Sequence, residues 1–246
     1  MEPRGGPPFL IVAHPGHELR LFHWMERTRP DVFVLTDGSG GEGVSRLGFS
    51  RDCLARAQAR PGAVFGPFPD RHWYAAIQRA DAAPFVEATR IIAGAAAACR
   101  PAIVVADPVE GYNPMHDLCA AVADAVTQAL IRDGGDPQRL TFPLTESAPR
   151  GLETRIDLDG DAVGRKRDAL LAYQPLLGEI SALMAADASA LGTEALAPAQ
   201  SHWPEHWSPH YEEVGRQRVA SGRYEAVITY DHHVGPIARA ILQARF

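Results

Sequence analysis

Two histidines stand close together after an apolar run near the start of the chain. Residues 9–13 are apolar without interruption, and His14 and His17 follow them, separated by Pro15 and Gly16. Imidazole nitrogens are common ligands of zinc and other divalent metals, so a His-x-x-His spacing can supply two ligands from one loop. The same spacing also occurs in histidine pairs that are packed or hydrogen bonded. The motif alone therefore leaves both interpretations open.

His116 is the candidate for a third ligand. It follows a second apolar run, residues 102–106, at the start of a helix expected over residues 114–132. Uninterrupted apolar runs of this length are typical of strands buried on both faces of a parallel sheet. The carboxyl ends of such strands meet at one edge, where α/β proteins bind their ligands. Three protein ligands with an open fourth position form a catalytic zinc site, in which the metal activates water and polarises a carbonyl group.

The elements that must position these histidines alternate along most of the chain. Alternation of strands and helices indicates βαβ units, and therefore an α/β fold with a mostly parallel sheet. The pattern predicts strands at 9–13, 31–35, 63–65, 102–106, 140–144, 154–158 and 226–230, and helices at 18–27, 47–59, 84–100, 114–132, 162–186, 210–220 and 237–242. Residues 197–210 have the Pro, His and Trp content of a lid or rim over a site.

Composition excludes several classes of protein. With 246 residues, 46% of them hydrophobic, the chain is long enough for one large domain over residues 1–246. The net charge is -6 and the 24 Lys and Arg residues are scattered, which argues against a nucleic-acid partner. Residues 1–8 do not resemble a signal peptide, and no apolar run approaches the roughly 20 residues of a membrane span. We expect a cytoplasmic protein with no membrane partner, and the sequence leaves a homo-oligomer open.

Residues 13–18, Ala-His-Pro-Gly-His-Glu, resemble the Ala-His-Pro-Asp-Asp-Glu motif of the LmbE-like, or PIG-L, family of zinc-dependent N-deacetylases. Weaker similarities to later blocks of that family lie at residues 36–38, Arg51, 68–70 and 166–174. The resemblance implies a Rossmann-like, three-layer αβα fold with a mostly parallel sheet. It also implies a zinc or other divalent-metal cofactor and the removal of an acyl group from a small amino-sugar conjugate.

The resemblance implies a set of site residues. The metal ligands are expected to be His14, His17 and His116. Substrate contacts are expected from Asp37, Arg51 and Asp70, together with Tyr112 in the loop before His116. Each of these four has a structural alternative: the aspartates could cap helices, the arginine could be solvated, and the tyrosine could be only a wall of the cleft.

This chain departs from the family pattern at the residues that would transfer protons and at one metal ligand. Gly16 stands in place of the aspartate that acts as general base, and His17 replaces a ligand aspartate by another competent ligand. Asn113 and Met115 stand in place of the family's transition-state histidine and of its aspartate beside the metal. With three neutral histidine ligands, the metal site carries one more positive charge than with two histidines and an aspartate. The higher charge favours ionisation of metal-bound water, so a built-in base is less necessary.

Other residues must then complete the chemistry. An amide nitrogen needs a proton before it can leave. Candidates for the donor are Glu110, Asp107 and His233, and more distantly the imidazoles at 202, 206, 210 and 232. Asn113 could donate its amide NH2 to the developing oxyanion. Asp107 also precedes a proline, so it could simply shape a turn.

Two other functions are compatible with this sequence. A relative that kept the metal but lost hydrolysis, and that binds sugars or acts as a scaffold, would explain the missing base. A dinucleotide-binding oxidoreductase would explain the Gly-x-Gly-x-x-Gly spacing of residues 38–43. Against the second function, these glycines follow the second expected strand, and the next helix is expected only from about residue 47.

Overall fold

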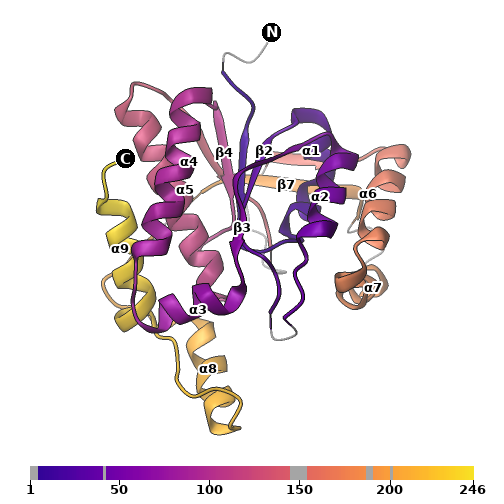
Figure 1. Cartoon of the computed structure of the whole chain (residues 1–246). Coiled ribbons are helices and arrows are strands. Elements are labelled where there is room, and N and C mark those ends of the chain that lie inside the picture. Colours follow the sequence, from indigo (N-terminus) through magenta and orange to yellow (C-terminus); the bar gives the residue numbers. More distant parts are fainter. Residues whose placement is uncertain (1–4, 41–42, 145–153, 187–190, 200–201) are drawn as a thin grey trace.

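A seven-stranded sheet with helices on both faces forms the centre of the molecule (Figure 1). The computed structural model describes residues 5–40, 43–144, 154–186, 191–199 and 202–246. The strand order is β3-β2-β1-β4-β5-β7-β6, with β7 antiparallel to both of its neighbours and the other pairs parallel. The strands are β1 (Phe9–Val12), β2 (Asp31–Thr36), β3 (Arg60–Phe68), β4 (Ile103–Ala106), β5 (Gln138–Thr141), β6 (Thr154–Asp157) and β7 (Thr193–Pro198). The expected α/β fold with a mostly parallel sheet is confirmed.

The helices cover the sheet on two sides. Helices α4 (Ala83–Cys99), α5 (Pro114–Arg132) and α9 (Gly235–Gln243) lie on one face, and α1 (Phe22–Thr28), α2 (Leu47–Ala57), α6 (Gly160–Ala172) and α7 (Leu177–Ala186) lie on the other (Figure 1). Short 3-10 turns precede α1 and α7, namely η1 (His17–Leu21) and η2 (Gln174–Leu176). Helix α3 (Asp70–Gln78) follows β3, and α8 (His210–Ala220) projects beyond the body of the sheet (Figure 1).

Strand β1 is buried on both faces, which explains its lack of polar alternation. Phe9 and Ile11 point into the core beneath α4, α5 and α9, whereas Leu10 and Val12 point into the core beneath α1 and α2. All four side chains are fully inaccessible to solvent. Each apolar residue of the run is therefore required by one of the two helix layers.

Strands β1 and β4 are neighbours in space although they are far apart in sequence. The chain order of the sheet reverses between them, because β2 and β3 lie on one side and β5 on the other. Ligands of open α/β sheets bind outside the carboxyl ends of the strands at such a reversal. The loops that carry His14, His17 and His116 all begin at this point of the sheet.

The second half of the chain differs from expectation in two places, and the first half in one. No strand forms at 226–230; these residues are irregular up to a π-helical turn, η4 (Tyr230–Val234). Strand β7 occupies residues that include the start of the expected lid, because Leu196 and Ala197 pack in the core. Helix α3, in the first half, has no counterpart among the predicted helices. None of the described helices is long and apolar enough to cross a membrane.

Candidate metal centre

The rings of His14, His17 and His116 gather at the carboxyl ends of β1 and β4. Their centroids are 5.4 Å apart for His14 and His17, 5.4 Å for His14 and His116, and 4.7 Å for His17 and His116. Their side chains are only 17%, 18% and 9% exposed, respectively. The structure thus brings together the three histidines that the sequence predicted as ligands. They come from two loops that are about 100 residues apart in the chain.

Each of the three rings turns its Nδ1 atom toward an oxygen. His14 Nδ1 lies 2.9 Å from Thr36 Oγ1 and 3.2 Å from Asp70 Oδ1. His17 Nδ1 lies 2.9 Å from Asp107 Oδ2, and His116 Nδ1 lies 3.3 Å from a carboxylate oxygen of Glu110. A carboxylate at Nδ1 favours the tautomer in which that atom carries the proton, so the lone pair is left on Nε2.

Burial and these carboxylates set the charges of the site. Burial lowers the pKa of His14, and it lowers the pKa of His116 to about 4, so both rings are neutral at pH 7. Burial also acts on His17, but the charge and hydrogen bond of Asp107 outweigh it and raise the pKa of this histidine. Burial opposes ionisation of Asp70, yet hydrogen bonds led by that from His14 lower its pKa to about 2.

The donor set fits a single divalent metal. Nε2 of His14 is buried and has no hydrogen-bond partner, although a buried polar atom normally has one. Three imidazoles that bind one tetrahedral zinc through nitrogens at about 2.0–2.1 Å have ring centroids roughly 5 Å apart, which is the spacing seen in this cluster. As the side chains stand, no group of three or more His, Cys, Asp or Glu residues in the described part of the chain has the geometry to hold a metal ion. The fit therefore rests on the spacing of the rings and on the unpartnered nitrogen.

Leu176 lies against Gly16, the position at which the resemblance implies an aspartate that acts as general base. Gly16 has a φ of 110°, and a Cβ atom at this residue would lie 2.5 Å from Leu176 Cδ1. Its N–H donates to Glu18, whose carboxylate is fully buried and is also hydrogen bonded to Ser50. Tyr173 OH lies 3.1 Å from the same serine hydroxyl. The loop between the two histidines is therefore held in a conformation that favours glycine.

An aspartate at Gly16, as the resemblance implies, should be unfavourable for this reason. The Gly16→Asp variant is expected to lose about 1–3 kcal/mol of stability, because a residue with a Cβ is strained at this φ. Its thermal unfolding midpoint should fall, and Leu176→Ala added to it should recover only the part that is due to the steric contact. A Gly16→Asp protein as stable as the parent would show that the loop has another accessible conformation.

The loop before His116 is held by α5 and by its own cap. Asp117 accepts hydrogen bonds from the backbone N–H groups of Glu110 and Gly111, at 3.0 and 3.1 Å. Asn113 caps α5 through its side-chain oxygen, which accepts from Met115 N and from Tyr74 OH. The Asn113 oxygen thus accepts two hydrogen bonds, which fixes the orientation of the amide. The NH2 group is the donor of this amide.

The structure reveals the partners of two expected proton donors. Asp107 is fully buried, and its Oδ2 accepts from Ala13 N as well as facing His17. Burial opposes its ionisation, but the charge of His17 offsets this effect and its pKa is lowered. Glu110 faces the Nδ1 edge of His116. Both carboxylates thus lie beside Nδ1, the ring nitrogen opposite Nε2, which is where carboxylates would orient histidine ligands that bind a metal through Nε2.

His233 is held by a different contact. Its Nδ1 accepts from the backbone N–H of Thr229 at 3.0 Å. It lies in η4, so the expectation that it follows a strand's carboxyl end was wrong, because residues 226–229 do not join the sheet.

The residues expected to contact substrate divide into two groups. Asp37 accepts from the N–H groups of Ser39 and Asp70, and Asp70 accepts from Gly40 N while facing His14, so both organise the loop after β2 and the start of α3. Arg51 is exposed on α2 and stacks over Phe65 with 4.8 Å between guanidinium carbon and ring centroid. Tyr112 is 57% exposed, and its ring lies 6.1 Å from the ring of His210.

Several residues that shape the site have no role predicted from the sequence. Thr36 shares the Nδ1 of His14, Glu18 fixes the loop of the two histidines, and Leu176 covers Gly16. Glu18 had a signal in the motif itself, whereas Leu176 comes from a turn about 160 residues further along the chain and could not be found from spacing.

The glycine-rich loop does not have the geometry of a dinucleotide site. It follows β2 rather than β1, and α2 begins only at Leu47 instead of at the last glycine. The fingerprint requires a glycine turn that opens directly into a helix. Gly41 and Glu42 of this loop lie outside the described residues.

The expected rim segment packs against the loop that precedes His116. Gly111 has a φ of 67°, and a Cβ atom there would lie 2.7 Å from Trp207 Cζ2, so the tryptophan lies directly on the backbone of this loop. Tyr211 N donates to Gly111 O at 3.0 Å, and Trp203 packs on the core formed with α5. Residues 200 and 201 of the segment lie outside the described part of the chain.

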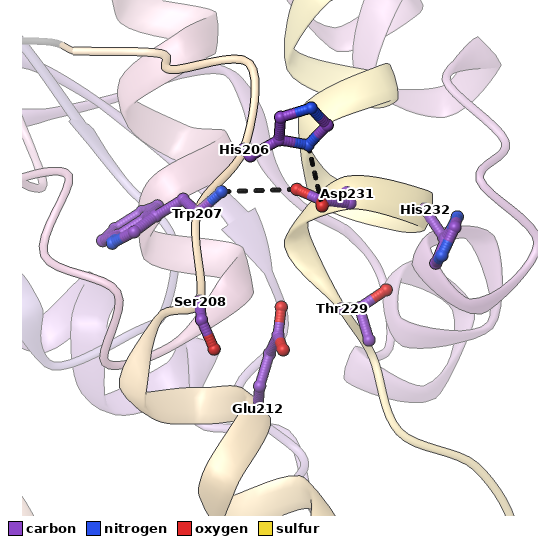
Figure 2. Close-up of a pocket in the computed structure, with 7 residues that line it drawn as sticks. All are labelled: His206, Trp207, Ser208, Glu212, Thr229, Asp231 and His232. Atoms are coloured by element: carbon purple, nitrogen blue, oxygen red, sulfur yellow. Dashed lines mark hydrogen bonds and ion pairs between the residues drawn. The ribbon is translucent and has the colours of Figure 1, made fainter.

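An open depression of about 480 Å³ lies between this segment and η4, and Figure 2 shows its lining. Asp231 accepts hydrogen bonds from His206 Nδ1 at 3.1 Å and from Trp207 N at 3.3 Å. Glu212 accepts from Tyr230 N at 2.8 Å. None of the three clustered histidines lines this depression, and its polar contacts fasten the rim segment to η4.

No family model and no curated protein matches this sequence. Solved structures do match. A deacetylase triple mutant of the teicoplanin biosynthetic pathway has a TM-score of 0.58 at 13% identity, over 78% of this chain and 96% of that one. The zinc-inhibited form of teicoplanin deacetylase has a TM-score of 0.52 at 10% identity, over 79% and 100% of the two chains. A conserved protein from Thermus thermophilus has a TM-score of 0.51 at 16% identity, over 91% of each chain. The expected resemblance is confirmed at the level of the fold: this chain has the three-layer α/β fold of the LmbE-like deacetylases.

Proposed function

We propose that this protein is a metal-dependent hydrolase that removes an acyl group from an amino-sugar or related small-molecule conjugate. His14, His17 and His116 would hold a zinc or similar divalent ion through Nε2. The observation that carries the proposal is the arrangement of the three imidazoles, each with Nδ1 against a carboxylate or hydroxyl oxygen, together with the buried, unpartnered Nε2 of His14. The deacetylase fold found in the comparisons supports the same class of reaction.

The residues of this chain would each have a defined part in that reaction. The metal, when bound, supplies Lewis-acid activation of water and of the acyl carbonyl. Asp107 and Glu110 keep the proton on Nδ1 of their histidines and so orient the ligand nitrogens. The NH2 group of Asn113 can donate to the carbonyl oxygen as negative charge develops on it. The loop of Gly16, closed by Leu176, contributes no carboxylate to this surface.

Metal analysis and amine release together test the proposal. Protein purified without added metal should contain about one zinc or other divalent ion per chain when three histidines hold it. The loaded protein should release free amine from a panel of N-acetylated amino sugars, measured with an amine-reactive fluorophore. Protein that binds no divalent metal even after zinc is added would contradict the proposal.

A second candidate function is a metal-binding relative that no longer hydrolyses its ligand. Gly16 favours it, because this residue has no carboxylate where the resemblance implies the general base and because its φ of 110° disfavours any side chain there. Zinc binding together with binding of N-acetylated sugars, but without amine release, would select this function over the first.

Asp107 gives a test of the orienting contacts. Asp107→Asn is expected to weaken zinc binding about 10- to 100-fold, because the ligand His17 loses its charged partner at Nδ1. Competition with a chromophoric chelator would measure the change. Asp124→Asn is a matched control, since Asp124 of α5 pairs with Arg139 at 2.9 Å and its substitution should leave zinc affinity unchanged. Equal effects of the two substitutions would rule out a specific role for Asp107.

A further inference from the structure

Gly111, in the loop between β4 and α5, is hydrogen bonded at both its N–H and its carbonyl. The N–H donates to Asp117 Oδ1 at 3.1 Å, and the carbonyl accepts from Tyr211 N, at the start of α8, at 3.0 Å. The N–H of Glu110, the preceding residue, donates to the same Asp117 oxygen at 3.0 Å. Asp117 is fully buried in α5. Two consecutive amides of this loop are therefore held by one carboxylate of the core.

Glu110 connects this part of the loop to the histidine cluster. Its backbone N–H is held by Asp117, and its carboxylate lies 3.3 Å from Nδ1 of His116. The contact at Nδ1 decides the orientation of the His116 ring and the ring nitrogen that carries the proton. Because a side chain moves with its backbone, a shift of the loop at residues 110–111 would change this contact.

Trp207 packs directly on the backbone of Gly111. A Cβ atom at Gly111 would lie 2.7 Å from Trp207 Cζ2 and 2.8 Å from Trp207 Cη2. The φ of Gly111 is 67°, a conformation that also favours glycine. The indole ring thus occupies the space that a side chain would need, and it limits the movement of the loop at this residue.

Trp207 is itself held by η4. Its N–H donates to Asp231 at 3.3 Å, a contact that Figure 2 shows. Its ring lies 5.5 Å from the ring of Tyr230, at an interplanar angle of 73°. Tyr230 is fully buried, and its hydroxyl donates to Pro204 O at 2.7 Å. The backbone and the ring of Trp207 therefore both have partners in η4, and an edge-to-face pair of this kind favours one orientation of the indole.

We propose that Trp207 is a positioning residue for His116: its ring, held by η4, keeps the loop at Gly111 in place, and with it the carboxylate at Nδ1 of the histidine. This role rests on the proposed function, because it assigns to the rim segment the control of a metal ligand. A purely structural role would lower the stability of the whole fold when the ring is removed. A positioning role predicts a change confined to this loop and to the ligand that it orients.

Amide hydrogen exchange of the metal-free Trp207→Ala protein, followed by NMR, distinguishes the two roles. We expect the amides of Glu110 and Gly111 to exchange at least about tenfold faster than in the parent, because the loop opens locally more often. The amides of Ser39 and Asp70, which donate to Asp37 in another loop, should keep the rates of the parent. Equal acceleration at both loops would show a purely structural role and overturn the proposal.

Two further measurements follow the effect to the ligand. Nitrogen NMR of the metal-free parent should show His116 protonated at Nδ1, whereas Trp207→Ala should show a mixture of the two tautomers. The zinc affinity of Trp207→Ala, measured by competition with a chromophoric chelator, should be about three- to tenfold lower than that of the parent. This is less than the expected effect of Asp107→Asn, which removes the direct partner of a ligand.

Trp203→Ala is the matched control, because it removes the same ring from the same rim segment. The Trp203 indole N–H donates to Asp124 of α5 at 3.4 Å. Its removal should leave the loop exchange, the His116 tautomer and the zinc affinity as in the parent. Effects of Trp203→Ala as large as those of Trp207→Ala would overturn the proposal. If Trp207→Ala does not fold, Trp207→Phe, which lacks the Cζ2 and Cη2 atoms, should give the same changes at a smaller size.

The role of Trp207 and the hydrolase function can fail separately. Loop exchange and a His116 tautomer that stay as in the parent, or an unchanged zinc affinity, would overturn the positioning role. A parent protein that binds no zinc would instead contradict the proposed function. The exchange rates and the tautomer of the metal-free protein would in that case still decide whether Trp207 orders the loop.

Discussion

His14→Ala is expected to weaken zinc binding at least about 100-fold, more than the loss of a carboxylate that only orients a ligand. The substitution removes the one nitrogen of the cluster that is buried without any partner among the described residues. Two imidazoles would remain, and zinc in proteins is held by three or four protein ligands. Metal content after dialysis and competition with a chromophoric chelator would measure the loss, and amine release should fall with it.

His206→Ala is the control for His14→Ala. His206 is 77% exposed and lines the open depression of Figure 2 rather than the cluster. Its removal should leave zinc content and affinity as in the parent protein. Circular dichroism would show that both variants are folded. A His14→Ala protein that keeps the affinity of the parent would contradict the assignment of this histidine as a ligand.

Glu194→Ala is expected to lower the free energy of unfolding by about 3–5 kcal/mol, the usual cost of removing one partner from a buried ion pair. Glu194 is 3% exposed and accepts from Lys166 Nζ at 2.8 Å. It also accepts from the backbone N–H groups of His23 and Trp24 at 2.8 Å, at the start of α1. The substitution would leave a buried ammonium group and two helix donors without their acceptor.

Urea denaturation followed by circular dichroism would measure this effect. Glu87→Ala is a matched control, because Glu87 and Arg90 form an ion pair on the surface of α4 with side chains 55% and 63% exposed. Exposed pairs contribute little, so the urea midpoint should hardly move. The double substitution Glu194→Leu and Lys166→Met should recover part of the lost stability, since no charge is left unpaired. A Glu194→Ala midpoint close to that of Glu87→Ala would show that the pair is not needed.

The sequence was a good guide wherever one segment decides its own structure. The apolar runs at β1, β2 and β4 indicated buried strands, and Pro114 indicated the start of α5. It failed at 226–230, where five residues with strand-like composition end in the π-helical turn η4. Ile228 and Tyr230 of this segment pack in the core that includes α5 and α9 without joining the sheet, and composition alone does not distinguish these two environments.

The sequence by itself determined that three histidines follow β1 and β4. It also determined that Gly16 carries no carboxylate. The convergence of the histidines could be inferred because the ends of neighbouring parallel strands meet. Only the tertiary structure decided which atom of each ring faces Asp70, Asp107 or Glu110. It also decided that Leu176 covers Gly16 and that Trp207 lies on the backbone of Gly111. These contacts join residues that are far apart in the chain, and their geometry depends on side-chain packing, which local spacing does not encode.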